Sequence, residues 1–329
     1  MTSTMNRRAF IAALLTAAAW PLAGRAEETA FDVPFGVPFD ILEFDWIDVA
    51  RQRSVPVRLY LPREVSAQRP APLVVFSHGI GGTRRGYSYL GKHWASQGYA
   101  SLHLQHVGSD RYLWQGQSSL LEVIGRVRDA LQEAEAVART QDLRFAIDQL
   151  FASALAPRLD ADRIVAAGHS YGANTTLLVA GARVEGNRFP TDLGDARIKA
   201  AIVISAPPFF GAAAPQRVLG SVTVPSLHIT ATGDVIQIPG YFSDAADRVT
   251  VFEATGSRRK LLAVFEGGSH SMFTDRASTG GATLNMQVKA ATKDLSAAFL
   301  SSVFDGDDAA LKSWPQRFAG ILARFSATP

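Results

Sequence analysis

The chain alternates between short apolar runs and longer stretches in which apolar residues recur every three or four positions. Residues 143–150 are an example of the second kind. Apolar runs of strand length lie at residues 72–77, 99–104, 163–167, 200–205, 225–230 and 260–265. Strands that alternate with helices pair in parallel, so this order predicts an α/β fold: a mostly parallel central sheet with helices on both faces.

The two ends of this region have different patterns. Residues 41–61 alternate apolar and polar side chains, which predicts an antiparallel hairpin before the parallel strands. Residues 282–304 and 308–326 have helical patterns and are expected to close one face. The acidic stretch 305–308 lacks the other ligands of a calcium loop and is expected to be a turn and helix cap. No linker, repeat or second signature interrupts residues 27–329, which predicts one domain.

The first 26 residues have the layout of a secretory signal peptide. Arg7 and Arg8 precede the apolar run 9–20, which is too short to span a membrane, and small residues follow up to Ala26. The adjacent arginines favour the twin-arginine route. We therefore expect export to the periplasm or the exterior, with 27–329 as the mature domain. The alternative is a hydrophobic helix retained in the fold.

Removal of this segment would change the charge balance. The chain has 33 Lys and Arg against 30 Asp and Glu, and loss of Arg7, Arg8 and Arg25 would leave 30 of each. A neutral domain without a run of basic and aromatic residues is not expected to bind nucleic acid. The chain has no cysteine, so an exported domain would be stable without disulfides.

The most specific chemical signal is Gly-His-Ser-Tyr-Gly at residues 168–172. It lies between the apolar run 163–167 and the helix-like segment 173–182. A sharp turn from strand to helix exposes the Ser170 hydroxyl at the top of the sheet, where the helix N-terminus favours developing negative charge. This context predicts a nucleophilic serine. The alternative is a glycine-rich turn with an idle serine.

A serine nucleophile needs a base, which in enzymes with this turn follows it in the order serine, acid, histidine. Only His228 and His270 follow Ser170. His228 lies inside the run 225–230 and is expected to be a packed core histidine. His270 follows an apolar run and a glycine pair that lets the loop turn back over the sheet, so it is the predicted base.

The predicted acid is Asp234. It follows the run 225–230, at the strand end where α/β sheets collect functional groups. The loop after 200–205 reads Ala-Pro-Pro-Phe-Phe and has no carboxylate. Asp244 and Asp247 are the rivals, and either could instead cap a helix.

The run 72–77 ends in His-Gly-Ile-Gly-Gly, residues 78–82. One oxyanion donor of such enzymes is the N–H after the nucleophile, here Tyr171, and the other comes from this earlier loop, where we predict Ile80. The glycines lack the spacing of a phosphate-binding loop. His78 has no identifiable partner and is expected to be structural. The sequence offers no ligand cluster, so we expect neither a cofactor nor a metal.

Aromatic residues provide candidates for an apolar acyl pocket. These are Tyr112, Trp114, Phe209 and Phe210. The alternative for each is ordinary packing. Asp110, close to the first two, is expected to hold a loop or cap a helix.

These motifs resemble those of serine-type α/β-hydrolases, especially esterases like platelet-activating-factor acetylhydrolase and chlorophyllase, and predicted dienelactone hydrolases. The resemblance runs from residue 72 to about residue 275, and Gly-Gly-Ser-His at 267–270 is similar to cutinase-like polyester hydrolases. Dienelactone hydrolases use a cysteine nucleophile, so their activity is not implied. The acetylhydrolases keep their acid one strand earlier, where this chain has Ala206 and Pro207. That difference weakens the expectation of a phospholipid substrate. It favours Asp234 as the acid, as in the cutinase-like enzymes.

The sequence thus predicts an exported serine hydrolase that cleaves a small or polymeric carboxylic ester through an acyl-enzyme on Ser170. It predicts no nucleic-acid partner and no stable membrane span in the mature form. Two alternatives remain open. The same fold could act as an amidase, acyltransferase or perhydrolase, or the chain could be a non-catalytic binding module.

Overall fold

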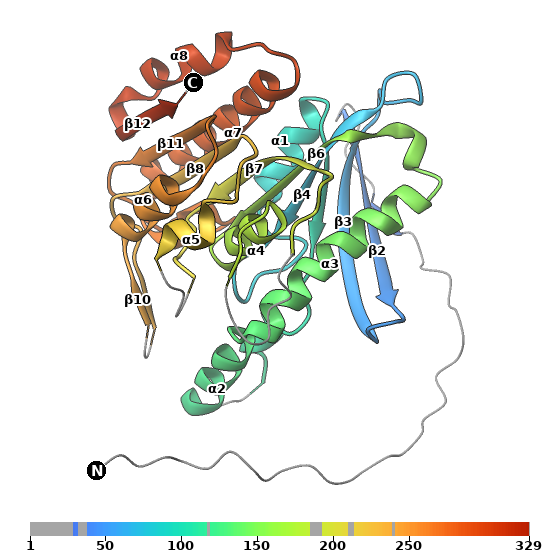
Figure 1. Cartoon of the computed structure of the whole chain (residues 1–329), viewed down its shortest axis with the longest axis horizontal. Helices are drawn as coiled ribbons and strands as arrows, with labels where there is room; N and C mark the ends of the chain where they lie inside the picture. The colour runs from blue at the N-terminus through green and yellow to red at the C-terminus, as the bar shows by residue number, and fades with distance from the viewer. Residues whose placement is uncertain are drawn as a thin grey trace.

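The computed structural model describes residues 29–31, 38–116, 119–184, 193–209, 214–238 and 241–328. The predicted signal segment lies outside them. The described residues form a ten-stranded sheet in the order β1-β2-β3-β5-β4-β6-β7-β8-β11-β12, and β9 and β10 form a separate hairpin (Figure 1). The strands are β1 (Thr29–Phe31), β2 (Phe39–Asp48), β3 (Arg53–Pro62), β4 (Ala71–Ser77), β5 (Ala100–Leu104), β6 (Leu159–His169), β7 (Ile198–Ile204), β8 (Ser226–Ala231), β9 (Ile236–Ile238), β10 (Tyr241–Ser243), β11 (Lys260–Phe265) and β12 (Leu322–Thr328).

The central strands run parallel, from β5 through β4, β6, β7 and β8 to β11. The expected hairpin before them is β2 and β3, which pair antiparallel from Phe39 opposite Pro62 to Asp48 opposite Arg53. All residues of β4, β5 and β8 are buried. This is why these strands are continuous apolar runs rather than alternating ones.

Helices cover both faces of the sheet, and α2 projects from one end (Figure 1). The helices are α1 (Ser88–Ser96), α2 (Leu120–Ala130), α3 (Glu133–Ala152), α4 (Tyr171–Val179), α5 (Pro215–Leu219), α6 (Ala245–Ala254), α7 (Ala282–Phe304) and α8 (Ala309–Arg317), with 3₁₀ turns η1 (Arg111–Trp114), η2 (Ala156–Arg158), η3 (His270–Phe273) and η4 (Ala319–Ile321). None of the helices in the described ranges is both long and apolar enough to cross a membrane.

Alternate residues of the same strands supply the two cores. In β4, Val75 belongs to the core shared with α3 to α6, whereas Phe76 belongs to the core shared with α1, α7 and α8. Side chains of successive strand residues point to opposite faces, so one apolar run fills both cores. The predicted α/β architecture is confirmed.

The C-terminal segment corrects one expectation. The pattern of residues 308–326 predicts a helix, but α8 ends at Arg317 and Leu322–Thr328 form β12, antiparallel to β11. The free edge of β11 offers backbone hydrogen-bond partners, which a helical apolar pattern does not reveal. Phe325 then packs against Trp314, with ring centroids 5.5 Å apart. The acidic stretch before α8 is a turn, with Asp308 at the N-cap.

Candidate active site

Ser170 occupies the tight turn between β6 and α4. Its φ and ψ of 56° and −125° are unusual for a residue with a side chain. The turn is possible only because glycine lies on both sides. A Cβ atom on Gly172 would collide with the Ser77 carbonyl oxygen, and one on Gly168 would collide with the Gly172 carbonyl. The sequence pattern therefore reflects close backbone contacts between β6, α4 and the end of β4.

Three predicted side chains form a hydrogen-bonded row above this turn. His270 Nε2 lies 2.8 Å from Ser170 Oγ, and His270 Nδ1 lies 2.7 Å from Asp234 Oδ1. Ser170 follows β6, Asp234 follows β8, and His270 begins η3 after β11. A carboxylate only accepts hydrogen bonds, so Nδ1 carries the imidazole proton. Nε2 is then free to accept the proton of the serine hydroxyl.

Asp234 is fully buried and accepts hydrogen bonds from several side chains. Besides His270, its donors are Ser205, Thr230 at 2.7 Å and Arg248 at 3.4 Å. Burial alone would raise the pKa of Asp234. The hydrogen bond and charge of His270, together with Arg248 and Ser205, outweigh burial and hold that pKa well below its usual value. The carboxylate therefore stays ionised beside the imidazole.

The two rival acids serve α6 instead. Asp244 is the N-cap of this helix and accepts the Ala246 N–H at 3.0 Å. Asp247 completes the capping box by accepting the Asp244 N–H. His228 is buried within β8, 3.3 Å from Ser226 Oγ, as expected of a core histidine. Asp110 caps η1 by accepting the Tyr112 N–H.

The loop after β4 lies directly against Ser170. A Cβ atom on Gly79 would lie 3.1 Å from Ser170 Cβ. The Gly79 carbonyl accepts hydrogen bonds from Gly82 N–H at 3.0 Å and from His78 Nδ1–H at 2.7 Å. In a trans peptide the carbonyl and the next N–H point in opposite directions. Since the Gly79 carbonyl points into the loop, the Ile80 N–H points away from the loop's own hydrogen bonds. Within the described ranges, neither Ile80 nor Tyr171 donates its backbone N–H to another group.

A fully buried arginine, Arg139 of α3, lies beneath this loop. It donates to the His78 carbonyl, and to Thr175 Oγ1 at 2.9 Å. Its guanidinium carbon lies 4.5 Å from the centre of the Tyr171 ring. No local sequence signal indicates this contact, because Arg139 follows His78 by 61 residues. The Arg139 side chain thus contacts both His78, in the loop that precedes Ile80, and Tyr171.

A second Ser-His-Asp row lies deeper in the fold. His106 Nε2 lies 3.0 Å from Ser77 Oγ, and His106 Nδ1 lies 3.0 Å from Asp142 Oδ2. All three residues are fully buried, so a substrate cannot reach them. Arg51 and Arg53 also bond Asp142. Through these bonds the β2–β3 hairpin and α3 are connected to the end of β4.

Of the four predicted pocket residues, Trp114 contacts the loop after β4. A Cβ atom on Gly81 would collide with its indole nitrogen, so the ring lies on the Gly79–Gly82 loop. Tyr112 and Trp114 are half exposed, at 51% and 52%. Phe209 packs against the core shared with α4, and Phe210 lies outside the described residues.

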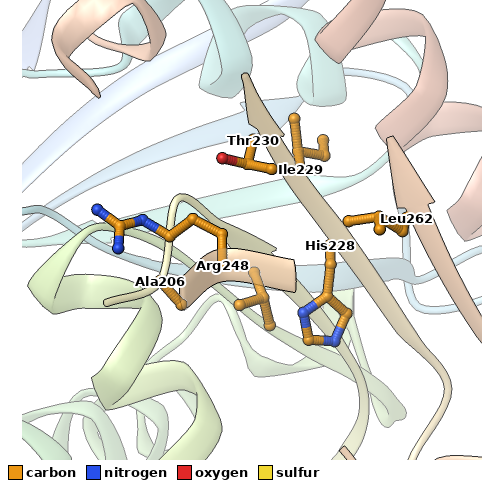
Figure 2. A pocket seen from close by; sticks show the side chains of 7 residues that line it. Ala206, His228, Ile229, Thr230, Arg248 and Leu262 are labelled. Carbon is orange, nitrogen blue, oxygen red and sulfur yellow. The ribbon is translucent and has the colours of Figure 1, made fainter. Parts of the chain in front are cut away.

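A small pocket lies beside β8 (Figure 2). It is lined by Val203, Ala206, His228, Ile229, Thr230, Arg248 and Leu262. Two of these residues, Thr230 and Arg248, are hydrogen-bond donors to Asp234. Ser170 does not line it, so this pocket is not the predicted acyl pocket. In the part of the chain that the structure describes, no cluster of His, Asp and Glu could hold a metal ion.

Comparison with known proteins agrees with this architecture. A family model described as platelet-activating factor acetylhydrolase, isoform II, matches residues 55–114. A ferulic acid esterase from Streptomyces cinnamoneus is 22% identical, with a TM-score of 0.60 over 84% of this chain and 93% of that one. A cold-adapted esterase from an Arctic intertidal metagenomic library is 17% identical, with a TM-score of 0.54 over 81% of this chain and 99% of that one.

No curated protein matches the chain. At these identities the solved structures establish the fold, which is the α/β-hydrolase fold. The predicted resemblance to the acetylhydrolases is confirmed over the matched residues, which include the strand and loop that lie against Ser170 in space.

Proposed function

We propose that this chain, which has the α/β-hydrolase fold, is a serine hydrolase that cleaves carboxylic esters through an acyl-enzyme on Ser170. The observation that carries the proposal is the row from Ser170 through His270 to Asp234, with distances of 2.8 and 2.7 Å. The two esterases of the same fold and the partial match to an acetylhydrolase family add support for ester chemistry.

The reaction begins with transfer of the Ser170 hydroxyl proton to His270 Nε2 as Ser170 Oγ attacks the ester carbonyl carbon. The tetrahedral intermediate places its negative oxygen on the N–H groups of Ile80 and Tyr171. One such donor lowers the barrier by about 3 kcal/mol. His270 then gives its proton to the departing alcohol, and the acyl group stays on Ser170.

Deacylation repeats these steps with water as the nucleophile. His270 takes a proton from the water as its oxygen attacks the acyl carbon. The tetrahedral intermediate then collapses, the bond to Ser170 Oγ breaks, and His270 returns the proton to Ser170 Oγ as the acid leaves. Asp234 holds the imidazole in the tautomer with Nδ1 protonated, and its charge stabilises the imidazolium formed in each half of the reaction. None of these steps calls for a cofactor.

We also propose that the enzyme works outside the cytoplasm. The basic and apolar layout of the first 26 residues supports export, and the absence of cysteine from the whole chain is compatible with an oxidising compartment. Protein found in the periplasm or medium, and beginning near residue 27, would support this. Intact protein retained in the cytoplasm would contradict it.

The test is hydrolysis of p-nitrophenyl esters from acetate to palmitate by the full chain and by residues 27–329, with Ser170→Ala beside each. The proposal predicts hydrolysis that disappears in the Ser170→Ala protein while its circular dichroism spectrum is unchanged. The optimum acyl length then reports the size of the acyl group that the site accepts. Activity retained without the Ser170 hydroxyl, or no hydrolysis by folded wild-type protein, would refute it.

A further inference from the structure

Tyr87, which precedes α1, has a backbone conformation that is uncommon for a residue with a side chain. Its φ and ψ are 59° and 30°, in the left-handed region. The side chain is buried at 4% exposure, and its ring lies 4.7 Å from that of Phe76. Such conformations persist where the surroundings hold them, and they cluster at functional sites. The contacts of the Tyr87 hydroxyl show which groups this tyrosine connects.

The Tyr87 hydroxyl joins two parts of the candidate site. Its oxygen lies 2.8 Å from His169 Nδ1 and accepts the Gly79 N–H at 3.3 Å. His169 Nε2 in turn lies 3.0 Å from the carbonyl oxygen of His270. The chain of hydrogen bonds therefore runs from the loop after β4, through the turn that carries Ser170, to the backbone of His270.

The direction of each of these hydrogen bonds follows from the acceptor at the end of the series, the His270 carbonyl oxygen. A carbonyl oxygen only accepts, so His169 Nε2 must carry a proton. In a neutral imidazole the other nitrogen is then an acceptor, and Tyr87 donates its O–H to Nδ1. The tyrosine oxygen remains free to accept the Gly79 N–H. Every donor in the chain thus has an acceptor.

This series of hydrogen bonds requires a neutral His169. Burial, and after it the charge of His270, lower the pKa of His169 to about 3. The ring is 2% exposed and lies 4.7 Å from the His270 ring, so the two imidazoles also pack against each other. His169 therefore contacts His270 in two places: its ring nitrogen donates to the His270 carbonyl, and its ring packs against the His270 ring.

We propose that Tyr87 and His169 are positioning residues that hold the Gly79–Ile80 loop and His270 in fixed relation to each other across Ser170. The proposal rests on the proposed serine hydrolase function and adds to it. The hydrogen bonds of these two side chains go to Gly79, to each other and to the His270 carbonyl, and not to Ser170 Oγ or His270 Nε2. Their effect is on the geometry of the groups proposed to act on the substrate, namely the Ile80 N–H and His270 Nε2.

The first test is Tyr87→Phe, which removes one oxygen and keeps the ring that packs on Phe76. We expect kcat for p-nitrophenyl acetate to fall about 10- to 100-fold, because a small misplacement of catalytic groups has an effect of that size. KM should change by less than about twofold, since substrate contacts are kept. Rates are normalised to active protein by titration with a fluorophosphonate. Tyr99→Phe is the control, a buried tyrosine just before β5.

A double-mutant cycle with His169→Gln tests whether the two residues act as one chain. If they do, the double variant is no slower than the slower single variant. If the two losses multiply, the residues act independently and the proposed chain is wrong. A fully active Tyr87→Phe enzyme would also overturn the proposal.

The hydrogen positions are tested by nitrogen NMR of the full chain with labelled histidine. We expect His169 to be protonated at Nε2 and not at Nδ1 from pH 5 to 8, with its signals assigned from the His169→Gln spectrum. A proton on Nδ1 of His169 would show that the proposed hydrogen-bond series is wrong, whatever the activity. Wild-type protein that cleaves no ester would overturn the proposed function and the positioning role together, whereas active wild type with unchanged variants overturns the positioning role alone.

Discussion

Asp234, the proposed acid, is a buried carboxylate whose charge is compensated by several donors. A buried carboxylate is unfavourable unless its charge is compensated. Here Ser205, Thr230 and Arg248 donate to it from the end of β7, from β8 and from α6, in addition to His270. Asp244 and Asp247, the rivals in the same region, instead cap α6 at its N-terminus.

We predict that Asp234→Asn lowers kcat by about 10⁴-fold, because an amide favours the wrong imidazole tautomer and does not stabilise the imidazolium. The measurement is steady-state hydrolysis of p-nitrophenyl acetate. Asp244→Asn is the matched control and should stay within about twofold of wild type, since asparagine also caps helices. A reversed order of the two variants would move the acid to α6.

The residues that could be predicted from sequence are those next to a local signal. Ser170 lies between glycines, His270 follows a glycine pair, and Asp234 follows an apolar run. Arg139, Tyr87 and His169 have no such signal for their contacts, because their partners lie far along the chain. The hydrogen bond from Tyr87 to His169, for example, joins residues 82 positions apart.

At the scale of elements, the turn from β6 to α4 depends on the absence of side chains at its glycines. We predict that Gly172→Ala destabilises the protein by about 3 kcal/mol or more, because the new methyl group would overlap the backbone of Ser77. Urea unfolding followed by circular dichroism measures this.

The matched control is Gly125→Ala within α2. A Cβ atom at Gly125 meets nothing within 4 Å. Since alanine favours a helix over glycine, this change should stabilise the protein by up to about 1 kcal/mol. Equal effects of the two substitutions would show that the turn tolerates a side chain, and the close backbone contact at Gly172 would then be wrong.

The elements themselves were predictable to different degrees. The parallel strands are buried on both faces, so each is a distinct apolar run. The strand β12 lies at the edge of the sheet and has exposed residues such as Ala323 and Arg324. Its pattern alone does not separate it from a helix, and its pairing with β11 decides its structure.

For the whole molecule, the buried histidines link stability to pH. The pKa values of His103, His106, His169 and His228 are lowered to about 3, and that of His78 is also lowered, in each case mainly by burial. Below pH 6.5 the unfolded chain binds protons at these positions and the native state does not. Stability therefore falls as the pH falls.

We predict that the free energy of unfolding decreases below about pH 6.5, by up to about 1.4 kcal/mol per pH unit for each of these histidines. Urea unfolding at pH 8, 7, 6 and 5 measures it. His228→Phe removes a histidine outside the candidate site and should make the slope shallower by one proton. A stability that stays constant from pH 8 to 5 would contradict the assignment of neutral buried imidazoles.

The overall architecture was predictable because the order of strands and helices follows from local periodicity. The site was predictable only in part, since the approach of the loop after β4 to the turn at Ser170 is a property of the assembled sheet. That approach brings Gly79 against Ser170 and allows the Tyr87 hydroxyl to reach both Gly79 and His169.

The central claim is that Ser170 forms an acyl-enzyme, and the most direct measurement is mass spectrometry of protein quenched with acid during turnover of p-nitrophenyl acetate. We predict one added acetyl group on the peptide that carries Ser170, and none in Ser170→Ala. An acetyl group on another residue, or steady turnover by wild type without any acetylated protein, would contradict the claim.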